Sequence, residues 1–211
     1  MAYGHGIHSL QGTFMSEPSA ASTSPVQSSP VTGSGATAAE SDIRARFRVL
    51  RVSGGPEGAV TVLHIGAEHT AIATGQGSET SAVLVLDIGA QKTARQFFRR
   101  SPPTPLEMEN AIATVEDEVI RAVPMLAPGT ALLCADTVVR EIALLAGVAP
   151  GEAMAMPLDA MERVFERLAA VAEGRPAVRE GLPQGADFAA ALLILREFMH
   201  HLRFGAITVL R

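Results

Sequence analysis

The segment His64-Ile65-Gly66-Ala67-Glu68-His69-Thr70 gathers the residue types that could perform chemistry in this sequence. A strand that ends in Gly-x-x-x-Thr and returns as a second strand presents backbone N–H groups and a hydroxyl to an anion, because glycine lets the turn approach a phosphate closely. The two histidines suggest a different chemistry. They would supply two nitrogen ligands to a divalent metal if they met across the hairpin and Glu68 or Asp87 supplied a third. The alternative is a structural turn with structural or exposed histidines.

Short β-type runs must position this turn. Residues 47–52, 59–65, 70–74 and 82–88 have the composition of strands, and the Gly- and Pro-containing loop 53–58 separates the first two. Four successive strands with tight turns predict an antiparallel meander at the start of the domain.

Helices and two further strands are expected after the meander. Thr104, Pro105 and Glu107 have the types expected of an N-cap, a first helical position and an acidic first turn. A short buried strand is predicted at 130–134, followed by a helix that Asp136 caps and Gly147 ends. A third helix begins near Asp159, a last helix covers about 187–202, and a strand closes the domain at 206–210. We therefore expect one α/β domain over residues 44–211, with helices packed on a mixed sheet.

Composition limits the partners and the location. Residues 16–41 are rich in Ser, Thr, Ala, Pro and Gly, so we expect residues 1–43 to be a disordered tail, with translation starting at Met1 or Met15. The formal charge of −5 argues against nucleic acid. No apolar run is long enough to predict a membrane span. The lack of Lys or Arg before Arg44 and the lone Cys134, expected to be a buried thiol, favour the cytoplasm.

Several segments, in order, resemble one known family. Residues 62–72 are similar to the second phosphate-binding hairpin of the exopolyphosphatase/guanosine pentaphosphate phosphatase (Ppx/GppA) family. Residues 86–98, 102–109, 181–183, 191–195 and 207–209 resemble the segments that follow that hairpin in the family. The resemblance implies a ribonuclease H-like, actin-like fold of which this chain has only the second of two subdomains that clasp phosphate.

The same resemblance exposes departures from the family pattern. The first phosphate loop has no counterpart before Phe47. Glu57 is a weak candidate for the catalytic base. Its segment, 53–59, resembles the family motif only faintly and lies too close to the hairpin, and its Pro56 and Gly58 suit an ordinary loop. His64 replaces an Asp that helps hold the metal, and Ala67 and Glu68 replace glycines. Glu68 would bring negative charge to the place where phosphate should lie.

Three functions follow as hypotheses. The first is a non-catalytic or ligand-sensing protein derived from the Ppx/GppA family, which binds a protein partner or a small phosphorylated ligand. The second is a phosphohydrolase acting on polyphosphate, a guanosine nucleotide or another phosphoanhydride, with Mg²⁺ or Mn²⁺, completed by dimerisation or by another chain. The third is a structural subunit whose open face pairs with a second copy or another protein.

Overall fold

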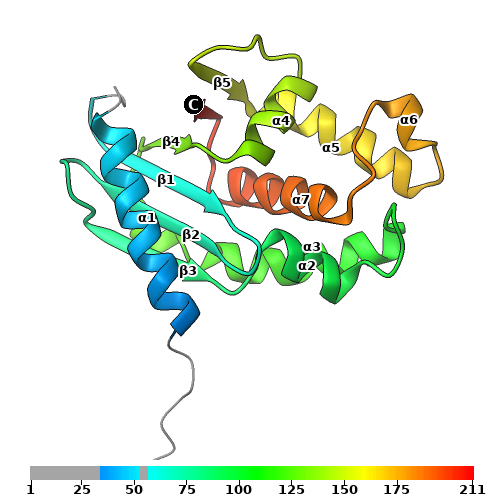
Figure 1. Ribbon diagram of the computed structural model, residues 1–211, viewed down its shortest axis with the longest axis horizontal. Helices are drawn as coiled ribbons and strands as arrows, with labels where there is room; N and C mark the ends of the chain where they lie inside the picture. Colours follow the sequence, from blue (N-terminus) through cyan, green and yellow to red (C-terminus); the bar gives the residue numbers. More distant parts are fainter. Residues whose placement is uncertain (1–33, 53–56) are drawn as a thin grey trace, which may run out of the picture. The chain divides into compact units, whose positions relative to one another are not determined.

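The computed structural model describes residues 34–52 and 57–211 (Figure 1), all within the compact unit Thr32–Arg211. The strands are β1 (Val60–Ile65), β2 (Thr70–Gly75), β3 (Ala82–Leu86), β4 (Ala131–Cys134), β5 (Ala153–Pro157) and β6 (Ala206–Leu210). The helices are α1 (Ser34–Val52), α2 (Ala90–Phe97), α3 (Pro105–Ile120), α4 (Thr137–Leu145), α5 (Leu158–Ala172), α6 (Ala177–Glu180) and α7 (Ala186–His201), with the 3₁₀ turn η1 (Val123–Met125).

The strands form one mixed sheet in the order β3-β2-β1-β4-β6-β5. β1, β2 and β3 form an antiparallel meander, β4 and β6 run parallel to β1, and β5 is antiparallel to β6. The predicted α/β class and the mixed sheet are confirmed. The meander has three strands in the described chain where four were expected, because the first of the four runs is helical.

Helix α1 is the main correction to the sequence-based prediction. Residues 47–52, predicted to be a strand, and residues 34–43, assigned to the tail, all belong to this helix. Its buried residues Ile43, Phe47 and Leu50 recur at helical spacing, whereas Val49 is 61% exposed. The alternating apolar residues Phe47 and Val49 therefore gave a strand-like pattern within a helix. The rest of the predicted tail and part of the predicted 53–58 loop lie outside the described residues.

The two faces of the sheet bury different clusters. Helix α1 lies across β1, β2 and β3 on one face (Figure 1), where Phe47 and Ile43 pack against Val60, Val62 and Ala73. The opposite face holds the larger core around α7, which contacts α2, α3, α4 and α5. Leu192, Leu193 and Ile194 of α7 are all fully buried, as the apolar composition of this helix predicted.

Two helix ends match the signals predicted from the sequence. Thr104 and Glu107 form the capping box that starts α3, and Pro105 occupies its first turn. Gly147 follows α4 with a φ of 84°, as expected of a helix stop.

Strand β5 was not predicted, because Ala, Met and Pro are poor strand formers. Among the described residues, no helix has the length and apolarity needed to cross a membrane.

Candidate functional site

The candidate site lies where β1 and β4 end. These strands are parallel neighbours, with Val62 paired to Leu133, so the residues after Ile65 and Cys134 share one edge of the sheet. Open α/β sheets bind ligands at the carboxyl ends of their strands. This edge therefore brings the predicted hairpin together with residues some seventy positions further along the chain.

A buried carboxylate organises this edge. Asp136 Oδ1 lies 2.6 Å from His64 Nδ1, and Oδ2 accepts a hydrogen bond of 2.7 Å from the backbone N–H of Ile65. The expected cap is not made: Asp136 stands at the N-cap of α4, but its side chain accepts no capping hydrogen bond there. Its oxygens are turned toward β1 because they satisfy a buried backbone N–H and an imidazole.

Helix α1 brings two charged side chains, Asp42 and Arg46, next to Asp136 and His64. Arg46 Nη1 lies 3.6 Å from Asp136 Oδ1, and Arg46 Nε donates a 2.6 Å hydrogen bond to Asp42 Oδ2. The other imidazole nitrogen, His64 Nε2, lies 4.0 Å from Asp42 Oδ2. The His64 side chain is 24% exposed. A buried carboxylate that holds an imidazole in one orientation is the arrangement used for general bases, although here the second nitrogen faces another carboxylate.

The turn of the hairpin is packed against the start of α2. The N–H of Ala90 donates to the carbonyl of Gly66, and the N–H groups of Gln91 and Lys92 both donate to the carbonyl of Ala67. Backbone N–H groups in the first turn of a helix are the usual anion-binding groups. Here, carbonyl oxygens of the hairpin already occupy three of them.

Gly89 allows this close packing. A Cβ at Gly89 would lie 2.5 Å from the carbonyl oxygen of Ala67, 2.5 Å from the carbonyl carbon of Glu68 and 2.6 Å from the backbone nitrogen of His69. All three are backbone atoms that cannot rotate away. The glycine at this position is therefore required by the docking of the hairpin onto α2.

Glu68 reinforces the same contact. Its two carboxylate oxygens accept hydrogen bonds of 2.9 and 2.8 Å from Arg95 of α2. These hydrogen bonds hold the pKa of Glu68 below its usual value. The charge expected to repel phosphate is thus paired with a guanidinium.

His69 and Thr70 are oriented differently from His64. His69 Nδ1 lies 3.6 Å from Asp87 Oδ1, and that carboxylate is also 2.5 Å from Lys92 Nζ. Nδ1 of His69 and the hydroxyl of Thr70 are buried and make no hydrogen bond within the described part of the chain.

The residues predicted to bind a metal do not gather into one group. No three His, Cys, Asp or Glu side chains of the described residues form a group that could hold a metal, so the site predicted from His64, His69 and Glu68 or Asp87 is not formed. The oxygens of Asp136 are engaged by His64 and the N–H of Ile65. The residues present therefore do not fit Mg²⁺ or Mn²⁺ held in the manner of the family.

Glu57 does not join this site. It is exposed and precedes the start of β1, whereas the hairpin follows the end of that strand. A strand of this length separates the two by about 20 Å. Glu57 is thus placed away from His64.

Sequence reasoning missed Asp42 and Arg46, and it assigned Arg95 no role at the hairpin. It assigned Asp136 a capping role and, through the family resemblance, a place in segment 134–138 that corresponds to a third phosphate loop. The helical spacing of Ile43, Phe47 and Leu50 was the one available signal for α1. Cys134, predicted to be buried, is fully buried beneath this edge. Burial raises the pKa of its thiol well above the usual value, and the neighbouring Asp136 charge adds to the effect.

The mixed sheet, with its antiparallel meander and its site at the carboxyl ends of β1 and β4, defines an actin-like α/β fold. Comparison with solved structures shows which known proteins have a similar fold. A Ppx/GppA family member from Aquifex aeolicus matches with a TM-score of 0.65 at 18% identity, over 81% of this chain and 57% of that chain. A second Aquifex aeolicus structure, described as the type II variant of its Ppx/GppA phosphatase, matches with a TM-score of 0.62 at 18% identity, over 77% of this chain and 56% of that one.

An exopolyphosphatase from Cytophaga hutchinsonii also matches, with a TM-score of 0.62 at 15% identity, over 82% of this chain and 59% of that one. The chain thus has a partial Ppx/GppA-like fold and spans less than two thirds of the length of each of these structures. No protein-family model and no curated protein matches the sequence.

Proposed function

We propose that this chain is a non-catalytic or ligand-sensing protein derived from the Ppx/GppA phosphatases, acting in the cytoplasm by binding a protein partner or a small anion. The proposal rests on the bonds that the residues at the phosphate-loop positions already make within the fold. The carbonyls of Gly66 and Ala67 cap α2, and Glu68 pairs with Arg95. Groups that would contact phosphate in a catalytic hairpin hold two parts of the fold together here.

The state of Asp136 supports the same proposal. A carboxylate that acts as a base or metal ligand needs an oxygen directed at the reacting water or ion. Both oxygens of Asp136 instead face protein groups, and Arg46 balances its charge. This edge of the sheet is consequently better suited to holding α1 than to turnover.

A phosphate-release assay tests the proposal. The purified chain is incubated with polyphosphate, and separately with a guanosine pentaphosphate, in the presence of Mg²⁺ or Mn²⁺. We expect release no faster than that of the His64→Gln variant, which preserves a polar side chain but removes the imidazole. Turnover that the wild-type chain shows and His64→Gln lacks would refute a non-catalytic role.

The alternative is a phosphohydrolase completed by a second copy or another chain. The 2.6 Å contact between His64 and Asp136 favours it, because it is the kind of pair that positions a general base. This function requires that turnover appear only in an assembly. The assay is therefore repeated at protein concentrations on both sides of any dimerisation midpoint, and a rate per chain that rises with assembly would support the alternative.

A structural subunit remains the third possibility, favoured by the edge strand β5. Ala153, Ala155 and Pro157 on one side of this strand are exposed, whereas Met154 and Met156 on the other are buried. An exposed edge strand offers both a face and unpaired backbone groups to another chain. We propose a second copy of this chain as the partner at β5.

A further inference from the structure

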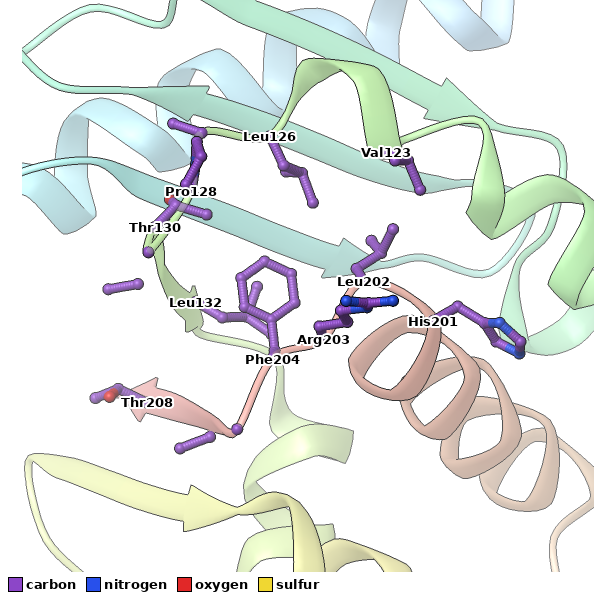
Figure 2. A pocket seen from close by; sticks show the side chains of 15 residues that line it. Val123, Leu126, Pro128, Thr130, Leu132, His201, Leu202, Arg203, Phe204 and Thr208 are labelled. Carbon is purple, nitrogen blue, oxygen red and sulfur yellow. The ribbon is translucent and has the colours of Figure 1, made fainter.

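Figure 2 shows a pocket of about 800 Å³, which lies at the other end of the parallel strands from His64. It is formed where β4 and β6 begin, between the segment that leads from η1 into β4 and the end of α7. Val123 and Leu126 line one side, and Leu202, Arg203 and Phe204 line the other. Its volume is in the range of pockets that hold small organic ligands, about 300–1,000 Å³.

Apolar side chains and polar groups both line the pocket. Figure 2 shows the side chains of Leu126, Val123 and Phe204 around the same space. The Phe204 ring stacks on Phe198 of α7 with centroids 5.7 Å apart, so the ring is held in place by the core. This arrangement provides a fixed apolar surface for the body of a ligand.

Arg203 provides the uncommitted charge. It is exposed, and its guanidinium makes no hydrogen bond or ion pair with any residue in 34–52 or 57–211. The nearby His201 is already engaged, because its Nε2 lies 3.0 Å from the carboxylate of Glu197. An anion in the pocket would therefore meet Arg203 as its available partner.

The backbone at Arg203 is also unusual. Its φ of 58° is the one positive φ of a non-glycine residue in the described chain. Arg203 occupies the position just after α7 where glycine is preferred, since Phe204 N–H donates to the carbonyl of Met199 and Arg203 N–H to that of His200. Glycine would be less strained than arginine at this position.

We propose that this pocket binds a small organic anion with an apolar body. The apolar part lies against Val123, Leu126 and Phe204, and the carboxylate or phosphate-ester group pairs with Arg203, whose planar guanidinium suits either oxyanion. The site is separate from the hairpin and does not depend on the function proposed for it.

Fluorescence titration with anilinonaphthalene sulfonate tests the proposal, since this probe has an aromatic body and one anionic group. N-phenylnaphthylamine, which lacks the anionic group, is the matched neutral probe. We expect one sulfonate-dependent site whose affinity falls about tenfold in Arg203→Gln, as expected for loss of a charged hydrogen bond. The neutral probe should bind the wild-type chain and Arg203→Gln equally.

Two further variants separate loss of the ligand contact from loss of the fold. Arg203→Gly relieves the positive φ, so it should unfold at the same or a higher temperature while losing the same affinity. Arg179→Gln removes an exposed positive charge elsewhere and should bind like wild type. His64→Gln should also bind like wild type, which distinguishes this site from the hairpin. Equal anionic-probe affinity in wild type and both Arg203 variants would overturn the proposal.

Competition identifies the anionic group. Octanoate and octyl phosphate have the same apolar chain and differ in their oxyanion. Displacement of the probe by one of them assigns a carboxylate or a phosphate ester, and displacement by both assigns a site for either. Failure of both to displace the probe at millimolar concentration would refute the proposed ligand class.

Discussion

Replacing Gly89 by alanine should separate the hairpin from α2. The added Cβ would lie 2.5, 2.5 and 2.6 Å from three backbone atoms of Ala67, Glu68 and His69. Real Cβ atoms do not approach so closely, and the backbone of a short turn has little room to move. Gly89 has φ −152° and ψ 161°, an extended conformation that alanine adopts freely, so the effect is steric.

The magnitude follows from the contacts that must yield. Overpacking in a rigid environment costs about 1–3 kcal/mol, and three backbone contacts place Gly89→Ala near the upper limit. Separating the turn also weakens the hydrogen bonds from α2 to the carbonyls of Gly66 and Ala67, each worth about 1 kcal/mol. We expect a loss of about 3 kcal/mol in the free energy of unfolding, which for a chain of this size lowers Tm by about 6–12 °C.

Gly185→Ala is the matched control, measured by urea and thermal unfolding followed by circular dichroism. Gly185 is the N-cap of α7, as Gly89 is of α2, and a Cβ there would meet nothing within 4 Å. Both substitutions share the N-cap preference and the change in chain entropy, so the difference between them isolates the steric cost. A difference below about 0.5 kcal/mol would refute the reasoning.

Four other results are expected. Asp136→Ala leaves a buried N–H and an imidazole unpaired and should cost about 2–3 kcal/mol in urea unfolding, whereas Asp159→Ala, at an exposed ion pair, should cost much less. The raised pKa of Cys134 favours the neutral thiol, so its stabilising contribution is lost as pH rises above the ordinary thiol value, and a thiol reagent should label it only as the chain unfolds. The lowered pKa of Glu68 stabilises the fold above the ordinary carboxyl value, so melting curves of Glu68→Gln and wild type should converge in acid. Ala155→Arg should convert a dimer to a monomer by light scattering, and a monomeric wild type would remove the basis for this prediction.

Local sequence signals were sufficient for much of the fold. The β1–turn–β2 hairpin, the capping box of α3 and the buried α7 all follow from patterns within about twenty residues, because propensity, capping and burial periodicity act locally. The order and types of the elements after β2 were recoverable for the same reason, except that α2, β5 and the short α6 were not predicted. The resemblance of residues 59–210 to the Ppx/GppA family agreed with the fold of the solved structures.

The sequence by itself thus determined where the candidate site lies, since a Gly-containing turn between two strands is a local feature. Only the tertiary structure decided what its residues contact. Asp136 meets His64 across 72 positions because two parallel strands are neighbours, and Arg95 reaches Glu68 because α2 packs beneath the turn. Phe47 to Val52 fitted both a strand and a helix, and burial of Ile43, Phe47 and Leu50 against the sheet selected the helix. Contacts between distant segments depend on strand order and helix packing, which no local pattern encodes.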